Sequence, residues 1–246
     1  MSIFARFRAI DDKDKAAAVR RLLESSTPKF DFFYITVLAV LMATFGVLAD
    51  SVSIVIGSML IAPVLYPILA VGLGLVMSSP QVITRASFTL LKAFGLSVVV
   101  SAGAATMALL FSDVAVVETF EVMSRTEPSL LHFLVAVVAG AAVAYVIGQP
   151  EWSDTLPGIA ISVALIPPLA VVGVGFAAWD ADIITGAFGL LALNVLGIVS
   201  AAVVTFSLMN LYEKEHIASS TIKKEDEKLA EEQATIQQMD EQLKHN

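Results

Sequence analysis

The sequence predicts an all-α polytopic membrane protein of about six transmembrane helices, built as two three-helix repeats of inverted topology with proline breaks in the second and fifth helices. Three observations lead to this prediction. The 246 residues are 57% hydrophobic and 15% charged, with a mean hydropathy of +0.81. Lys and Arg concentrate near the two ends of the chain, and a pattern of Pro and Gly recurs at a fixed spacing. A soluble domain needs more polar surface than this composition supplies, so we expect a lipid bilayer around most of the chain.

The expected spans are apolar runs of about 20 residues, the length that crosses a hydrocarbon core. They are residues 32–49, 51–77, 86–111, 130–148, 157–178 and 183–211. The chain then divides into an N-terminal segment (1–31), a first repeat (32–111), a loop (112–129), a second repeat (130–211) and a tail (212–246).

The basic residues indicate how the chain is oriented. Seven of the 15 Lys and Arg residues precede residue 30, and five follow residue 213. The positive-inside rule therefore predicts that both termini are cytoplasmic, in a multi-pass protein of the cell inner membrane. The first 30 residues lack the apolar core of a cleavable signal peptide, so we expect the first span to target the chain and to be retained.

Both terminal segments have helical patterns. Residues 12–25 carry apolar side chains at helical spacing beside Lys and Arg, and this helix either lies on anionic headgroups or forms a solvated lead-in. In the tail, apolar residues recur every seven positions, at Ile222, Leu229, Ile236 and Leu243. This single stripe leaves two interpretations open, a solvated acidic helix or a self-associating one.

An internal repeat appears when the sequence is shifted by 101 residues. The shift superposes the following pairs: Pro67 on Pro168, Gly72 on Gly173, Gly74 on Gly175 and Gly57 on Gly158. Because each repeat contains an odd number of spans, the second copy must enter the membrane in the opposite orientation. Inverted repeats of this kind are typical of secondary transporters, and matching Pro or Gly interruptions point to the binding site.

The interruptions fall in the second and fifth spans. Residues 51–77 would rise about 40 Å as one straight helix, against a hydrocarbon core of about 30 Å, so a break or a strong tilt is required. Pro63, Pro67, Pro167 and Pro168 each remove a backbone donor. The freed carbonyls must be buried in protein or line a wet cavity, where they could ligate a cation or a polar solute. A plain proline kink is the alternative.

Three further residues are candidates for a central site. Ser58 and Tyr66 flank the predicted break of the second span, and their hydroxyls would contact either a bound solute or a neighbouring carbonyl. Asn194 lies near the middle of the sixth span, where an unsatisfied amide is costly. It is either an interhelical hydrogen-bond partner or a site residue.

Two cations are candidates for a pathway. Lys92 lies about two turns inside the third span, and it either snorkels to the interface or lines the pathway as a buried cation. Arg125 is the basic residue on the predicted outer side. It either pairs with Glu121 four residues earlier or attracts an anion at the mouth of the pathway.

Several functional classes are not expected. The net charge of −8 gives no basic footprint for nucleic acid. The chain contains no cysteine and three scattered histidines, so we expect no metal site, and no motif for a cofactor or a catalytic nucleophile is present. We therefore expect no cofactor and no enzymatic activity.

Four motifs, in this order, resemble the bacterial and archaeal hydrophobic membrane proteins grouped as domain of unknown function 389. They are SIVIGSMLIAPVLYPIL from Ser53, RTEP from Arg125, ISVALIPPLAVVG from Ile161 and NVLGI from Asn194. The resemblance covers about residues 30–211, with one departure at Tyr66, where the family often has glycine before the second proline. It implies the fold and the membrane location, and it leaves the substrate open.

The sequence thus favours a secondary transporter of a small solute or ion, with a central site at the two broken helices and alternating access between the two halves. Two alternatives stay open. One is a channel formed by homo-oligomerisation through glycine-rich faces or the tail, and the other is a membrane scaffold without transport.

Overall fold

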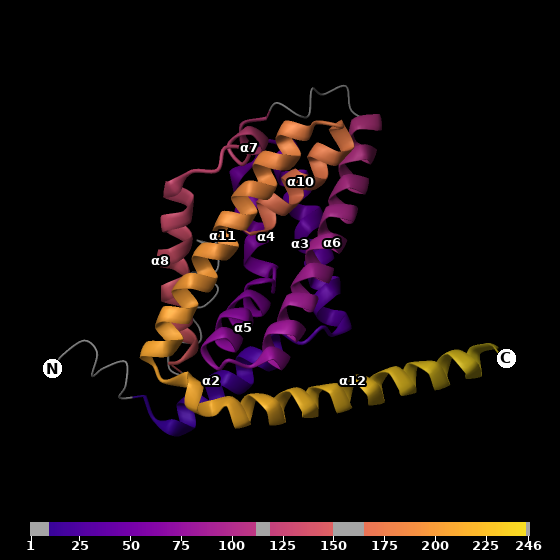
Figure 1. Ribbon diagram of the computed structural model, residues 1–246. Helices are drawn as coiled ribbons and strands as arrows, with labels where there is room; N and C mark the ends of the chain where they lie inside the picture. The colour runs from indigo at the N-terminus through magenta and orange to yellow at the C-terminus, as the bar shows by residue number, and fades with distance from the viewer. Residues whose placement is uncertain (1–9, 112–118, 150–164, 245–246) are drawn as a thin grey trace.

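The computed structural model describes residues 10–111, 119–149 and 165–244, whose regular structure is helical throughout (Figure 1). The elements are α2 (Asp12–Ser25), α3 (Phe30–Leu48), α4 (Val52–Ile61), α5 (Leu65–Val76), α6 (Pro80–Phe111), α7 (Phe120–Met123), α8 (Leu130–Ile147), α10 (Ile166–Ala178), α11 (Ala181–Leu208), the 3₁₀ helix η2 (Leu211–Lys214) and α12 (Glu215–Lys244). The all-α prediction is confirmed.

Four of these helices, α3, α6, α8 and α11, are long and apolar enough to cross a membrane. The pair α4 and α5 forms a fifth candidate span that is bent by 53°. These helices confirm a multi-pass membrane protein. Helix α10 is apolar but has 13 residues, too few to cross a bilayer alone. Residues 157–164, predicted to complete that span, lie outside the described residues, so a total of six spans stays a prediction.

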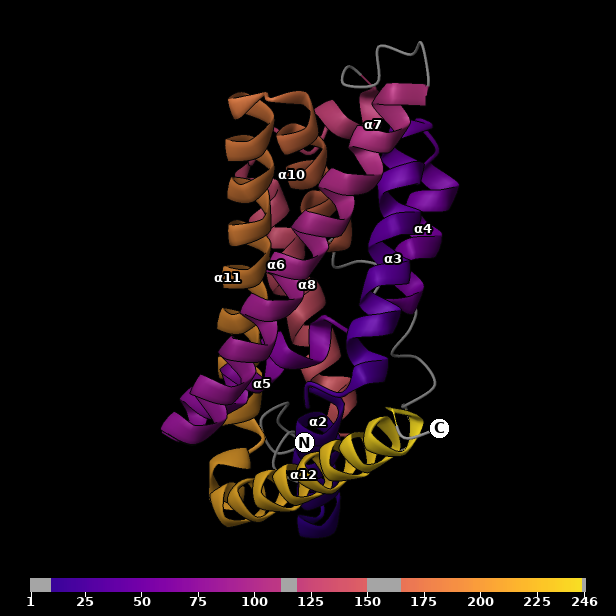
Figure 2. The ribbon, with the colours of Figure 1, turned by 90° about the vertical axis from the view of Figure 1, so that its right-hand side faces the viewer.

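The spanning helices stand side by side, with the shorter α5 and α10 between them (Figures 1 and 2). Helix α12 lies across one end of this bundle and α7 covers the other, and we call these the α12 end and the α7 end. Helices α6 and α11 run in opposite directions along the bundle (Figure 1). Each of α5 and α10 packs against both α6 and α11.

Helix α6 shows how the sequence adapts to lipid. Its buried face carries mainly small side chains, namely Val82, Ala86, Thr89, Ala93, Ser97, Ser101 and Ala105. Its large apolar side chains point outward, and Leu91 and Val99 are 69% and 70% exposed. Helices in lipid gain little from burying large apolar groups, so close backbone packing through small residues stabilises the bundle. The outward surface of α6 therefore faces the bilayer.

Helices α3, α5, α10 and α11 share one mode of termination. Each is followed by a residue in the left-handed conformation, which is Asp50, Ser78, Trp179 and Asn210 in turn. This conformation usually selects glycine, because a Cβ atom is strained there. The N–H of the next residue then bonds back into the last turn, as Ser79 does to Gly74 and Asp180 to Gly175, at 2.9 and 3.0 Å.

The α12 end is closed by α2 and the first part of α12, which pack against each other. The predicted helix 12–25 is present with those bounds. Its apolar face is covered by protein, since Val19 and Leu22 are at most 1% exposed. On α12, Ile222 is buried whereas Ile236 is 49% exposed, because the second half of α12 extends past the bundle (Figure 1). Within one chain, the apolar stripe of the tail is thus buried at Ile222 and exposed at Ile236.

A buried glutamate links α12 to the bundle. The Glu225 carboxylate, 1% exposed, lies 2.8 Å from Lys29 Nζ and 2.6 Å from Lys228 Nζ. Burial raises the pKa of Glu225, but the two ammonium groups outweigh it, so the pKa lies below its ordinary value of 4.5. Glu225 in turn raises the pKa of Lys228 above 10.5.

Docking of α12 should therefore weaken in acid. The pKa of Glu225 is lower in the folded than in the unfolded protein. Its contribution to the stability of α12 docking is therefore complete above the unfolded-state pKa of 4.5, and it is lost as the pH falls through the lower folded-state pKa. We expect Glu225→Gln to cost about 1 kcal/mol at pH 7, since both lysines stay partly solvated, and to reduce the acid dependence. Hydrogen exchange of α12 amides, followed from pH 7 to about pH 2, measures both effects. The exposed Glu227→Gln is the control, and equal behaviour of the two variants would contradict this role of Glu225.

Candidate functional site

The second span is interrupted between α4 and α5, at Ala62–Val64. Pro63 lies in the break itself, where it removes the backbone donor that a continuous helix would need. Pro67 lies in the first turn of α5 and is buried. A proline is tolerated in a first helical turn, since the N–H groups there have no acceptor within the helix. The predicted break is present: Pro63 lies within it, and Pro67 lies in the first turn of the helix that follows it.

Helix α10 begins in a similar way. Pro167 and Pro168 lie in its first turn, and both are buried. The residues before Leu165 lie outside the described residues, so whether the fifth span is broken there stays a prediction. The helix begins inside the bundle rather than at its surface, because Leu165 and Ile166 are 3% and 2% exposed.

The two short helices begin at mid-depth and point to opposite ends of the bundle (Figure 1). Helix α5 runs toward the α12 end and α10 toward the α7 end. Each approaches the facing long helix closely through a glycine. A Cβ atom on Gly72 would lie 2.8 Å from Ala202 Cβ, and one on Gly173 would overlap Ser101 and lie 2.8 Å from Ala102 N. Helix α5 is thus held closely against α11 and helix α10 against α6.

Buried hydroxyls gather where α10 passes α6. Ser101 donates to the carbonyl of Ala170 at 2.7 Å, and Thr44 Oγ1 of α3 lies 2.8 Å from Ser101 Oγ. One turn earlier on α6, Ser97 is fully buried, and its Oγ has no hydrogen-bond partner among the described residues. A buried hydroxyl without a partner costs about 1–3 kcal/mol, so Ser97 is available to a polar ligand.

The predicted hydroxyl and amide candidates occupy different surroundings. Ser58 is fully buried and donates to the Val55 carbonyl of its own helix at 2.6 Å, so its hydroxyl satisfies a local carbonyl. Tyr66 is partly buried and packs against the main apolar core. Asn194 is 5% exposed on the inner face of α11. Since α5 and α11 run parallel with Gly72 opposite Ala202, Asn194 lies at about the level of the break that contains Pro63.

Lys92 lies on the outside of the bundle. Its ammonium group sits 4.4 Å from the centroid of the Phe88 ring, and Phe88 is 56% exposed. A cation over an aromatic face gains about 0.5–1 kcal/mol at an exposed site. This arrangement agrees with a side chain that snorkels along the lipid-facing surface, and it keeps Lys92 away from the start of α10.

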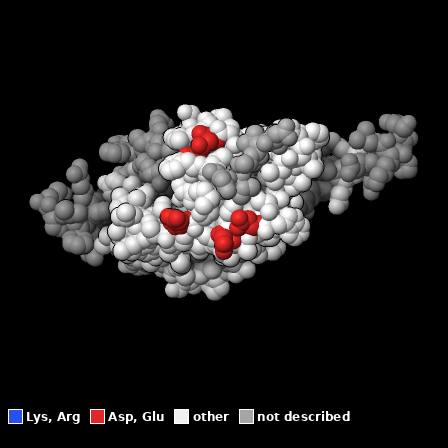
Figure 3. Space-filling model, turned by 90° about the horizontal axis from the view of Figure 1, so that it is seen from above, with Lys and Arg blue, Asp and Glu red and all other residues white. Residues whose placement is uncertain are grey.

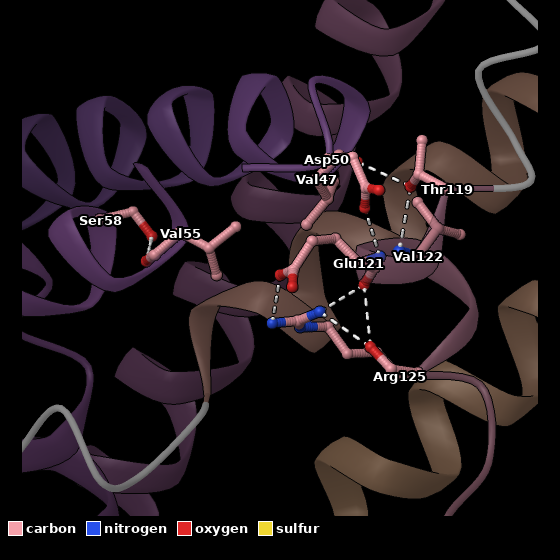
Figure 4. A network of polar contacts seen from close by, with 9 residues as sticks. Val47, Asp50, Val55, Ser58, Thr119, Glu121, Val122 and Arg125 are labelled. Atoms are coloured by element: carbon pink, nitrogen blue, oxygen red, sulfur yellow. Dashed lines mark hydrogen bonds and ion pairs between the residues drawn. The ribbon is translucent and has the colours of Figure 1, made fainter. Parts of the chain in front are cut away.

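Arg125 belongs to a polar cluster that closes the α7 end (Figure 4). Its Nη2 lies 2.8 Å from Glu121 Oε2, and the two side chains are 16% and 4% exposed. Asp50 at the end of α3 accepts from the Glu121 N–H at 2.9 Å, and Thr119 donates to the Val47 carbonyl at 2.8 Å. The predicted pair of Arg125 and Glu121 is therefore present within the α7 segment, whereas the hydrogen bonds of Asp50 and Thr119 anchor α7 to α3.

The charge at this end is largely acidic. Viewed from the α7 end, the described residues show Asp and Glu side chains and no Lys or Arg (Figure 3). Arg125 is tucked beneath this surface by its pairing with Glu121. Within the described ranges, no group of three or more His, Cys, Asp or Glu side chains is arranged to hold a metal ion.

Comparison with known proteins identifies the family. The family model described as "Domain of unknown function (DUF389)" matches residues 59–200. The chain belongs to this family. It is also 27% identical over 171 residues to an uncharacterised protein of Methanocaldococcus jannaschii, an alignment that covers 70% of this chain and 52% of that protein. The chain thus spans about half the length of this curated relative. No solved structure matches the chain.

The DUF389 match contains the break at Pro63, the start of α10 and most of α11. It excludes α2, α3, most of α4, and α12. Sequence reasoning overlooked the hydroxyls of Thr44, Ser97 and Ser101. The available signal was the spacing of Ser97 and Ser101, four residues apart on a face of α6 that otherwise carries mainly alanine.

Proposed function

We propose that this protein is a secondary transporter built from two inverted three-helix repeats, with its central site where α5 and α10 begin. The observation that carries the proposal is the placement of these two short helices, which start at mid-depth and run to opposite ends of the bundle (Figure 1). Discontinuous helices of this kind form the substrate sites of many transporters, because their free backbone groups face a cavity rather than lipid.

The 101-residue spacing supports the inverted repeat. It relates the starts of α5 and α10, at residues 65 and 166, and of α6 and α11, at residues 80 and 181. It also relates the left-handed residues Ser78 and Trp179.

The close approaches between helices support it further. Gly72 faces Ala202 across the two repeats, and Gly173 faces Ser101. The 101-residue shift carries Gly72 of the short helix α5 to Gly173 of the short helix α10. It also relates Ala202 of the long helix α11 to Ser101 of the long helix α6. Such a reciprocal pair is expected when a two-fold axis relates the repeats. Because α6 and α11 run in opposite directions, this axis lies in the membrane plane.

The chemistry of the central region favours a solute bound by neutral groups. Its buried polar side chains among the described residues are hydroxyls and one amide, namely Thr44, Ser58, Ser97, Ser101 and Asn194. The buried charged side chains of the described residues lie at the two ends of the bundle, on α2, α7 and α12. We infer that the transported species is a small polar solute, or an ion coordinated by neutral oxygens, and that no enzymatic reaction takes place at the site.

We also propose that both termini are cytoplasmic. The described Lys and Arg side chains concentrate on α2, on α12 and at the start of α6, while the α7 end is acidic on its surface (Figure 3). The positive-inside rule then assigns the α12 end to the cytoplasm.

Cysteine accessibility tests the pathway directly, since the natural chain contains no cysteine and every variant carries a single thiol. We expect Ser97→Cys and Asn194→Cys in lipid vesicles to react with a charged, water-soluble thiol reagent, because a thiol needs water to ionise and react. Val99→Cys, which faces lipid at 70% exposure, should stay unlabelled. Ser219→Cys on α12 and Ser129→Cys near the α7 end, both exposed, should react from opposite sides.

Each outcome has a distinct meaning. Reaction at Ser97→Cys and Asn194→Cys from alternate sides supports alternating access. If neither thiol reacts from either side while the surface thiols do, the central region is dry and the protein is a scaffold rather than a transporter. If Ser219→Cys reacts from the outer side, the proposed orientation is wrong.

A further inference from the structure

A groove of about 440 Å³ lies between the start of α6 and the first half of α12. Its lining combines apolar side chains, such as Phe88 and Leu229, with polar ones, such as Gln81, Thr84 and Arg85. It is separate from the central region, because it opens on the outside of α6 where Phe88 is 56% exposed. A mixed lining of this kind suits a ligand with one apolar and one polar part.

Arg85 is the polar group that dominates this groove. Its side chain is 17% exposed, and Nη1 forms an ion pair with Asp226 of α12. The other terminal nitrogen, Nη2, is buried and has no hydrogen-bond partner among the described residues. A guanidinium group presents a planar fork of donors that matches the oxygens of a phosphate. The free half of this fork therefore favours a phosphate ligand.

The position of the groove indicates where the phosphate comes from. Helix α6 is a membrane span, and α12 crosses the bundle at its base (Figures 1 and 2). The groove thus lies in the corner between a lipid-facing helix and a polar one, at the depth of the headgroups. Arg85, Phe88 and Lys92 fall on one face of α6, since they are three and seven residues apart. An acyl chain can continue from the groove along this face.

Among the side chains whose pairings are described, four cations and three acids surround the groove, since Glu24 also lies near Lys228. Arg85 and Asp226 compensate each other, while Glu225 is shared by two lysines, Lys29 and Lys228. Lys92 adds a further cation beside Phe88. An anionic headgroup is therefore favoured over one that carries its own cation.

We propose that the groove between α6 and α12 is a binding site for an anionic phospholipid, whose phosphate accepts hydrogen bonds from the Arg85 guanidinium and whose acyl chain lies over Phe88. The bound lipid would hold α12 against the bilayer-facing side of the bundle. This site shares no residue with the central region, so the lipid-binding proposal does not depend on the proposed transport function.

Native mass spectrometry of the delipidated full chain in detergent tests the site, with phosphatidylglycerol, phosphatidylethanolamine of the same chain length, and inorganic phosphate as probes. We expect phosphatidylglycerol to bind most tightly and Arg85→Gln to weaken this binding about tenfold. The control is Arg21→Gln, which removes the same charge from an exposed position on α2 and should leave the affinity unchanged.

A second variant separates lipid binding from a merely structural role of Arg85. Asp226→Asn removes the intrachain partner of Arg85 and leaves its fork free, so it should retain or tighten phosphatidylglycerol binding. If both Arg85→Gln and Asp226→Asn weaken binding equally, Arg85 acts only by docking α12, and the proposal is wrong. It is also overturned if inorganic phosphate binds as tightly as the lipid, or if Arg85→Gln alters only the oligomeric state, which would assign the groove to a second copy of the chain.

Discussion

Replacing Gly173 with alanine is expected to lower the melting temperature of the detergent-solubilised protein by about 5–10 °C, which corresponds to about 3 kcal/mol. The new Cβ atom would overlap the Ser101 side chain and lie 2.8 Å from the backbone nitrogen of Ala102. Because the second contact is with backbone, rotation of a side chain cannot relieve it. Helix α10 would have to move away from α6, and the hydrogen bond from Ser101 to the Ala170 carbonyl would be lost.

Gly103→Ala is the matched control for this substitution. Gly103 lies on α6 only two residues from Ser101, and a Cβ atom there has no neighbour within 4 Å. Alanine at this position should be neutral or slightly stabilising, since glycine inside a helix costs about 0.5–1 kcal/mol relative to alanine. Melting followed by size-exclusion chromatography compares the two. Equal stability of Gly173→Ala and Gly103→Ala would show that α10 does not pack on α6 as described.

The second large effect is expected at Gly186, near the start of α11. A Cβ atom there would overlap the Thr126 carbonyl oxygen and lie 2.8 Å from its carbonyl carbon. The segment that follows α7 must therefore shift by about 1 Å or more, which we expect to cost about 3 kcal/mol. The shift would also loosen the ion pair of Arg125 with Glu121 and the hydrogen bond from the Glu121 N–H to Asp50 that anchors α7 to α3.

Hydrogen exchange measures this displacement locally. Amides of residues 119–129 should exchange faster in Gly186→Ala than in the natural protein, and the melting temperature should fall. Gly189→Ala, one turn further along α11, is the control, since its Cβ atom would meet Pro128 at an ordinary 3.4 Å. Unchanged exchange over residues 119–129 in Gly186→Ala would contradict the close packing of this segment on α11.

These two glycines illustrate how function and packing are coupled here. The contact of Gly173 holds the middle of α10 against α6, and the contact of Gly186 holds the segment after α7 against α11. If the two halves move against each other during transport, as proposed, one of these contacts must change between states. Accessibility of Ser97→Cys in a Gly173→Ala background would therefore report on the same movement.

Much of the fold could be predicted from the sequence because lipid simplifies the problem. A backbone in hydrocarbon must satisfy its own hydrogen bonds, so apolar runs of sufficient length become helices. The predicted spans 32–49 and 130–148 agree with α3 and α8 within a few residues. The break in the second span follows from Pro63, because proline has no backbone N–H to continue the hydrogen bonding of the helix. The pairing of Arg125 with Glu121 follows from helical spacing alone.

Other features were beyond a single sequence. Pro67 looked like a break but occupies a first turn, because the effect of a proline depends on where its helix begins. For Lys92 the sequence left open both snorkelling and a place in the pathway, and the structure shows it outside the bundle, over Phe88. The hydroxyls of Ser97 and Ser101 were overlooked, since serine in a membrane helix usually bonds to its own backbone and carries no signal of a longer-range role.

The sequence by itself determined that this chain is helical, lies in a membrane and is interrupted in its second span, because these properties depend on local composition and on hydrogen bonding within one helix. Only the tertiary structure decided which helices face each other. The ion pair of Arg85 with Asp226 joins residues 141 positions apart, and the contact of Gly173 with Ser101 joins α10 to α6. Such contacts depend on the relative placement of helices, and in lipid that placement is set by small differences in close packing that no periodicity of one segment records.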